Sequence, residues 1–298
     1  MNSAFLLLPD FLLILLGFVL MRYTHLKRDL WDGVEKLTYF VLFPALLFHA
    51  INQTRFDWGG TSNMLLVAFL TFGSGIFLSF LSHWYAKDRL SWASGFQTAF
   101  RFNSYIAFAA AGRLAGEEGV ALMALTTGCM VPVANAVAVY ALARHSEQHL
   151  FKELIKNPLL VATCLGLISN IFEWRLPDYI ALGVSRLGSA SIALGLMTVG
   201  AGLMWLQNKR DGVLIAYWTS VKLLAMPAIA LGLGLFFGLP SAQLNNVVLF
   251  AAMPTATSAF VLANRMGGDG TIVAIAISVM TVLAAVTIPI WLTVLQSV

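Results

Sequence analysis

The chain has 298 residues, of which 59% are hydrophobic and only 11% are charged, and its mean hydropathy is +0.82. A soluble domain carries about 25% charged residues, so this composition excludes a water-soluble globule and indicates an integral membrane protein. The formal net charge is a modest +4, and the only two cysteines, Cys129 and Cys164, lie in apolar segments without metal-ligand spacing.

Ten apolar segments follow one another along the chain, and a helix needs about 20 such residues to cross the hydrocarbon core. They are residues 4–21, 34–52, 62–86, 92–112, 118–143, 157–173, 180–206, 212–238, 243–264 and 270–296. The first lacks a basic leader and a cleavage site and contains Asp10, which we expect to be solvated near the membrane boundary. The sequence predicts an all-α membrane protein with ten transmembrane helices.

The longest polar connector joins two halves of five segments each. We expect a first five-helix repeat over residues 1–145, a cytoplasmic linker over 146–156 and a second repeat over 157–298. Because five is an odd number, the second half begins on the opposite face of the membrane, so the repeats are inverted. The segments also match in order and length, for example the second segment against the seventh.

Basic residues in the loops predict the orientation. One set of alternate loops holds eleven Lys and Arg residues and the other only four. The larger set comprises Arg22, Lys27, Arg28, Lys87, Arg89, Arg144, Lys152, Lys156, Lys209, Arg210 and Arg265, and the smaller comprises Arg55, Arg113, Arg175 and Arg186. The larger set is expected in the cytoplasm, which places both termini outside it.

A polar stretch interrupts the fourth segment at residues 100–108, and another interrupts the ninth at 252–260. Each leads to an arginine and then to a glycine followed by an acidic residue, as Arg113 with Gly116-Glu117 and as Arg265 with Gly268-Asp269. Paired interruptions at matching places in two halves of a membrane protein are typical of a transport site at the repeat interface. Helices four and nine are therefore predicted to break and cross.

The interruptions supply the candidate substrate-binding residues. They are Arg101, Asn103, Ser104 and Tyr105 in the fourth segment, and Pro254, Thr255, Thr257 and Ser258 in the ninth. A charge at the bilayer centre costs about 2.5–3.5 kcal/mol, so Arg101 is expected to face a cavity, a partner or a ligand. A guanidinium fork and positive helix ends both favour a carboxylate, so this chemistry indicates an organic anion.

Each candidate also has a structural reading. Ser and Thr in the ninth segment can serve helix packing, and Arg101 can form an ion pair or extend to the membrane surface. Lys222 in the eighth segment is either a second anion contact or a lysine bound to backbone carbonyls at the broken helices. His49 and Asn135 are supporting polar residues, and for His49 a hydrogen-bonded core role competes with proton coupling.

Other classes of function lack their sequence signatures. The chain has no His-Glu-x-x-His zinc motif, no Gly-x-Ser-x-Gly elbow and no phosphate-binding glycine loop, so we expect no metal, no cofactor and no enzyme. Acidic residues other than Asp10 fall in loops or at helix ends, and this pattern does not support sodium coupling.

Five motifs in order resemble the auxin efflux carrier family, in particular its bacterial members. They are residues 42–48 (LFPALLF), Asn103 within 102–106 (FNSYI), residues 222–227 (KLLAMP), residues 254–263 followed by 267–269 (GGD), and residues 287–291 (TIPIW). Plant members have proline at both crossings, whereas the position opposite Pro254 here is Phe102. The resemblance covers essentially the whole chain.

The resemblance implies a scaffold domain and a transport domain, crossed helices four and nine, an elevator-like motion, a carboxylate substrate and a homodimer. It also implies that Asn103 contacts the substrate and that Pro254 marks the second break. Together with the residues, it predicts a sodium-independent secondary carrier for small organic anions in the cell membrane, an exporter or facilitator. A sodium- or proton-coupled importer, which a buried carboxylate near the crossing would favour, and a small-molecule membrane receptor are the alternatives.

Overall fold

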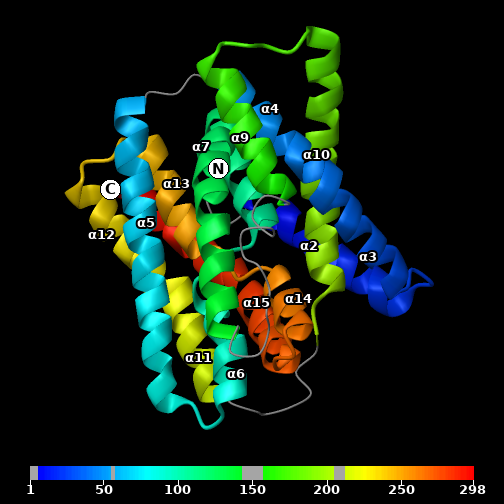
Figure 1. The fold of residues 1–298 in the computed structure, drawn as a ribbon, viewed down its shortest axis with the longest axis vertical. Helices are drawn as coiled ribbons and strands as arrows, with labels where there is room; N and C mark the ends of the chain where they lie inside the picture. The colour runs from blue at the N-terminus through cyan, green and yellow to red at the C-terminus, as the bar shows by residue number, and fades with distance from the viewer. Residues whose placement is uncertain (1–5, 55–57, 143–156, 205–211) are drawn as a thin grey trace.

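The computed structural model describes residues 6–54, 58–142, 157–204 and 212–298, and within these ranges it is helical and has no strand (Figure 1). The all-α prediction is therefore confirmed for the described part of the chain. The expected linker over 146–156 lies outside the described residues, as do Arg55, Lys209 and Arg210.

The helices follow the ten predicted segments closely. In chain order they are α2 (Leu8–Tyr23), α3 (Arg28–Leu37), η1 (Thr38–Leu42), α4 (Phe43–Gln53), α5 (Trp58–Leu81), η2 (Ser82–Tyr85), α6 (Arg89–Gly95), η3 (Phe96–Ala99), α7 (Ser104–Leu142), α9 (Pro158–Ile171), α10 (Asp178–Ala201), α11 (Gly212–Ser220), η5 (Val221–Ala225), α12 (Met226–Phe236), α13 (Ser241–Ala252), α14 (Ser258–Arg265) and α15 (Gly270–Gln296).

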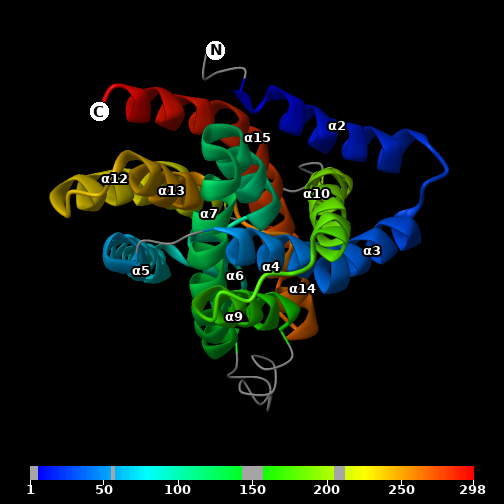
Figure 2. The same cartoon turned by 90° about the horizontal axis from the view of Figure 1, so that it is seen from above.

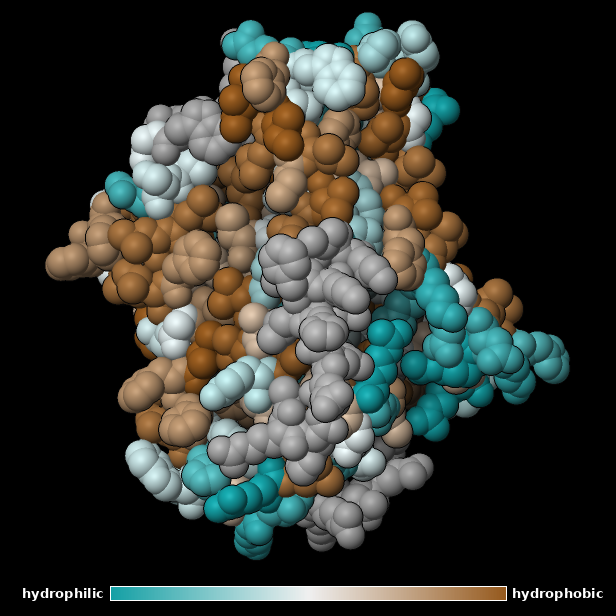
Figure 3. Space-filling model, viewed as in Figure 1, coloured by the Kyte–Doolittle hydropathy of each residue, from teal (hydrophilic) through white to brown (hydrophobic). Residues whose placement is uncertain are grey.

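Six helical stretches among the described residues are long and apolar enough to cross a membrane. The longest, Arg89–Leu142, changes direction at Ala115 and Gly116, where the backbone leaves the helical region and Gly116 takes a φ of 55°. The space-filling view shows apolar residues over much of the surface, with polar residues gathered over α3 and at the lower edge (Figure 3). The protein is thus a multi-pass membrane protein.

Two prolines are preceded by a short π-helical stretch. The stretch η1 leads into Phe43-Pro44, and η5 leads into Met226-Pro227. Proline lacks an N–H donor and its ring crowds the preceding turn, so the local widening from α to π geometry lets the helix continue through it. Both prolines therefore adjust a helix without ending it.

The helices form two groups side by side (Figures 1 and 2). One group contains α2, α3, α4, α9 and α10, and the other contains α5, α11, α12, α13 and α15. Helix α7 lies between them and packs on α4, α9 and α10 as well as on α13. The interrupted region at the start of α7 is therefore held at the boundary between the groups.

An ion pair connects α2 to the central helix α7. Asp10 on α2 is only 5% exposed, and its carboxylate accepts hydrogen bonds from Arg113 on α7, with Nε at 2.5 Å and Nη2 at 3.2 Å. The expectation that Asp10 is solvated is wrong. The sequence placed it near a boundary, but Arg113 lies 103 positions away in the chain and neutralises it there.

Helices α2 and α10 touch backbone to backbone at two glycines. A Cβ atom on Gly17 would lie 1.9 Å from the Met197 carbonyl oxygen, and one on Gly200 would lie 1.7 Å from the Ile14 carbonyl oxygen. Small residues at such positions allow close helix approach in membranes.

We expect Gly200→Ala to lower the stability of the protein in detergent by at least about 1–3 kcal/mol, because α2 must move away from α10. Thermal unfolding followed by tryptophan fluorescence would measure this loss. Gly183→Ala in the same helix is the matched control, since nothing lies within 4 Å of its added Cβ. Equal unfolding temperatures for the two variants would contradict the close-contact assignment.

Candidate functional site

Two non-helical stretches meet inside the molecule. Residues 100–103 separate η3 from α7, and residues 253–257 separate α13 from α14. The backbone N–H of Asn103 donates to the carbonyl oxygen of Pro254 at 2.7 Å. This bond joins the interruptions of the fourth and ninth predicted segments directly.

Asn103 begins helix α7. Its side-chain oxygen accepts hydrogen bonds from the backbone N–H groups of Tyr105 at 3.0 Å and Ile106 at 3.2 Å. An asparagine in this position satisfies backbone donors that a helix start leaves open. The carboxamide oxygen is therefore engaged within the protein as the cap of α7.

Aromatic residues pack around the first interruption. The rings of Phe102 and Phe250 have centroids 4.5 Å apart, and Phe72 contacts Phe100 edge-on at 5.6 Å. All four side chains are buried. Phe102 occupies the position at which plant members of the family have the proline of the first crossing. The backbone at Phe102 is not helical, and its ring packs into the core.

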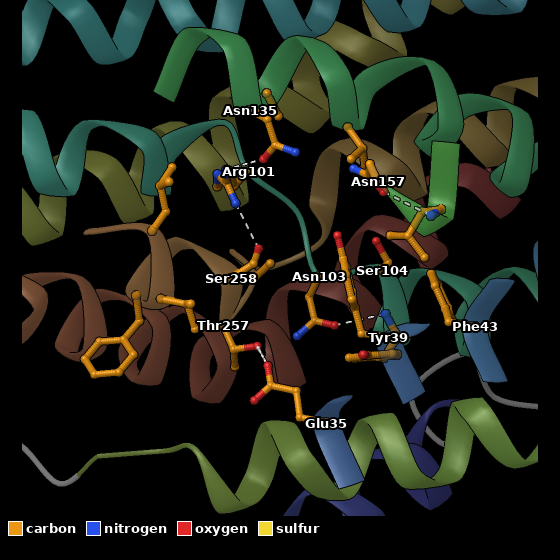
Figure 4. Close-up of a pocket in the computed structure, with 18 of the residues that line it drawn as sticks. Glu35, Tyr39, Phe43, Arg101, Asn103, Ser104, Asn135, Asn157, Thr257 and Ser258 are labelled. Carbon is orange, nitrogen blue, oxygen red and sulfur yellow. Dashed lines mark hydrogen bonds between the residues drawn. The ribbon is translucent and has the colours of Figure 1, made fainter. Parts of the chain in front are cut away.

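Arg101 is buried at 5% exposure, yet its partners are neutral. Its Nη1 donates to the Ser258 hydroxyl at 2.9 Å, and its Nη2 donates to the Asn135 side-chain oxygen at 2.5 Å. Within the described part of the chain, Nε has no hydrogen-bond partner and no carboxylate pairs with the guanidinium. The charge is thus held in place but not neutralised (Figure 4).

A cavity of about 830 Å³ opens beside Arg101. Seven of the predicted site residues line it, from the start and middle of α7, the stretch before it and the start of α14. They are Arg101, Asn103, Ser104, Tyr105, Asn135, Thr257 and Ser258. The sequence therefore identified residues that the fold brings together around one cavity.

The other four predicted residues do not line this cavity. Pro254 contributes its carbonyl to the bond with Asn103, and Thr255 is fully buried. His49 is partly buried on α4, and its Nδ1 has no hydrogen-bond partner among the described residues.

Lys222 is bound to the backbone beside the second interruption. Its Nζ donates to the Ala251 carbonyl at 3.0 Å, lies 3.8 Å from the Met226 sulfur and stands 5.9 Å from the centre of the Phe250 ring. Ala251 is near the end of α13, where helix carbonyls lack their usual N–H partners. This geometry corresponds to the structural reading of Lys222.

The sequence reasoning missed the wall that helix α3 and η1 provide. Arg28, Asp32, Glu35, Tyr39 and Phe43 all line the cavity. Their spacing of three and four residues was a usable signal, because it places them on one helix face. The predicted segment 34–52 leaves out Arg28 and Asp32, so it does not show this face as a whole. Asn157, Asn264 and Arg265 also line the cavity.

Glu35 is the carboxylate of this wall that approaches the broken ninth segment. The Thr257 hydroxyl donates to its Oε1 at 3.3 Å. Figure 4 shows Glu35 and Arg101 reaching the neighbouring residues Thr257 and Ser258 from opposite sides. The cavity thus has a cationic side and an anionic side.

No group of three His, Cys, Asp or Glu side chains that could hold a metal ion occurs in the described ranges. Fold and cavity define a multi-pass helical membrane protein with a cavity at a pair of helix interruptions, and both basic and acidic side chains line this cavity. A family model described as "Membrane transport protein" matches residues 141–292, and the chain belongs to this family, the auxin efflux carrier family.

Two relatives extend the similarity to nearly the whole chain. An "Uncharacterized transporter" of Methanothermobacter thermautotrophicus is 23% identical over 99% of both chains. A protein of Rhizobium meliloti named "Putative malonate transporter" is 25% identical over 88% of this chain and 86% of its own length. The chain is therefore a membrane transporter.

We expect Asn103→Ala to destabilise the protein by about 0.5–2 kcal/mol, because the start of α7 loses its cap. Asn103→Ser keeps a capping oxygen and removes the NH₂ group without adding a charge to this buried position, so it should unfold at nearly the wild-type temperature. Thermal unfolding of both variants in detergent separates the cap from any role in ligand binding. Equal destabilisation by the two changes would contradict this division.

Proposed function

We propose that the protein is a sodium-independent secondary carrier for small organic anions such as mono- or dicarboxylates, working by elevator-type alternating access. The observation that carries the proposal is Arg101, a buried guanidinium that lines a cavity and has no carboxylate partner among the described residues. Burying an unpaired charge is expensive, so an anionic ligand is the natural counterion.

The proposed architecture is two inverted five-helix repeats, over residues 1–145 and 157–298, whose broken fourth and ninth segments cross. The bond from Asn103 to Pro254 supports this crossing, and the similar positions of the two interruptions support the repeat. We propose that the group around α2, α4, α9 and α10 is the scaffold and that the group around α5, α13 and α15 moves with the substrate.

The proposed setting is the cell membrane, with both termini outside the cytoplasm and a homodimer formed through the scaffold. Export of a monoanion is favoured by about 2.3 kcal/mol at an inside-negative potential of 100 mV. Such a carrier needs no coupling ion, and it would act as an exporter or facilitator. The relative named for malonate makes short carboxylates the first substrates to test.

One observation favours a second candidate, a cation-coupled importer. A carboxylate near the interruptions is the feature such a carrier needs, and Glu35 lines the same cavity as Arg101. Transport measured with and without a sodium gradient, and with and without a pH gradient, distinguishes the two functions. Flux that requires either gradient would favour the importer.

The main prediction concerns Arg101. We expect proteoliposomes on a solid-supported membrane to give a saturable current with at least one mono- or dicarboxylate in the absence of sodium. Arg101→Ala should abolish this current while the protein still inserts, since the neutral variant cannot stabilise the anion. Arg101→Lys should retain part of it, because a lysine keeps the charge but loses the two-pronged donor geometry.

Two controls make the current interpretable. Unfolding temperature and proteoliposome content should be measured for each variant, so that loss of protein is not counted as loss of transport. Arg186→Ala on α10 removes a charge that does not line the cavity and should leave the current unchanged. Wild-type current in Arg101→Ala would remove the proposed site.

A further inference from the structure

The cavity carries an acceptor as well as a cation, and this restricts the carboxylates that fit it. Building on the proposed function, we propose that Glu35 is a specificity-determining residue. It selects carboxylates that carry a hydrogen-bond donor, a hydroxyl or an ammonium group, at the end remote from Arg101. Dicarboxylates and plain alkanoates are then the disfavoured ligands.

The first step of the argument is the position of Glu35. It lies on the face of α3 and η1 that lines the cavity, between Asp32 and Tyr39, and its side chain is partly buried. The Thr257 hydroxyl donates to Oε1 at 3.3 Å, which orients the carboxylate toward the start of α14. Its other oxygen has no hydrogen bond to a described residue.

The second step is that no basic side chain in the described ranges forms an ion pair with this carboxylate. Arg28 on the same face is paired with Asp32 at 2.9 Å, and both side chains are about half exposed. No Lys, Arg or His nitrogen lies within 4.0 Å of the Glu35 carboxylate among the described residues. Arg265 and Lys36 line the same cavity but form no ion pair with it.

The third step is the relation between the two charges. Arg101 donates to Ser258, and Thr257 donates to Glu35, so adjacent residues of one backbone connect the cation and the carboxylate (Figure 4). A ligand that extends from one to the other presents its carboxylate to Arg101 and its remote end to Glu35.

The chemical group at the ligand's remote end, next to Glu35, then determines the affinity of the protein for that ligand. A hydroxyl or ammonium group donates to the free carboxylate oxygen, and a hydrogen bond to a charged group is among the stronger ones in proteins. A second carboxylate would instead meet a like charge, and a methyl group would leave the acceptor without a partner. Sites with a buried polar group discriminate strongly against ligands that cannot pair with it.

The test uses ligands of matched length that differ only at the remote end. One set is 3-hydroxypropionate, β-alanine, malonate and propionate; the other is 5-hydroxypentanoate, 5-aminopentanoate, glutarate and pentanoate. Binding to the purified full-length protein would be measured by isothermal titration calorimetry at pH 7. In at least one set we expect the hydroxy or amino acid to bind at least about tenfold more tightly than the dicarboxylate, as one charged hydrogen bond provides.

Glu35→Gln should abolish this preference. Glutamine has the same shape and its carbonyl oxygen still accepts from Thr257, but it removes the negative charge, so the dicarboxylate should gain affinity and the amino acid should lose it. Asp29→Asn is the matched control. It removes one negative charge from the same helix at an exposed position outside the cavity, and it should keep the wild-type ranking.

Three results would overturn the proposal. One is the same ranking of ligands in wild type and Glu35→Gln. Another is dicarboxylate binding that tightens as the pH falls in wild type but not in Glu35→Gln, which would make Glu35 a proton-binding residue. The third is no binding of any acid, which would also remove the proposed function; an unchanged ranking with intact binding would remove only the role of Glu35.

Discussion

The hydrogen bond between the Asn103 N–H and the Pro254 carbonyl is the constraint on which the rest of the site depends. In a membrane, backbone groups that leave a helix must find partners within the protein, because the hydrocarbon offers none. Two interruptions placed together can supply partners to each other, whereas one alone could not. The same reasoning explains Lys222, whose ammonium group binds the Ala251 carbonyl where α13 ends. Gln97 serves in a similar way, donating to the Ala259 carbonyl in α14.

The satisfied backbone leaves side chains free for a ligand. The rings of four phenylalanines pack together around the interruption, and they are Phe72, Phe100, Phe102 and Phe250. With that shell in place, Arg101, Asn135 and Ser258 form a polar set on the other side, facing the cavity. The interruption thus has an apolar side that stabilises it and a polar side that can bind a ligand. Helix α3 completes the cavity from a different part of the chain, so the candidate site lies at the boundary between the two helix groups.

The sequence alone was sufficient to predict the helices and part of the candidate site. Each of the ten apolar segments overlaps a helix or a helix pair. This agreement arises because a membrane span is defined by a run of apolar residues, which can be recognised in a single sequence. The polar interruptions are equally visible in the sequence, which identifies Arg101, Asn135 and Ser258 as candidates. Glu35 was missed because it stands at the start of the predicted segment 34–52, and acidic residues at helix ends were not considered part of the site. The Asp10–Arg113 ion pair was missed for another reason, since pairing between distant residues depends on which helices pack together.

Two arginines show how a functional role can be distinguished from a stabilising one. They are Arg113 in α7 and Arg101 in the stretch before this helix. Arg113 is partly exposed and neutralised by Asp10, so it connects two helices and has no charge left for a ligand. Arg101 is more deeply buried, yet every partner it has among the described residues is neutral. If Arg101 served only to stabilise the fold, a carboxylate at the position of Ser258 or Asn135 would do so better, because a buried charge is least costly beside its opposite. A neutral cradle holds the guanidinium in position while its charge remains available. That choice of partners suits a cation whose counterion arrives, is held and leaves again.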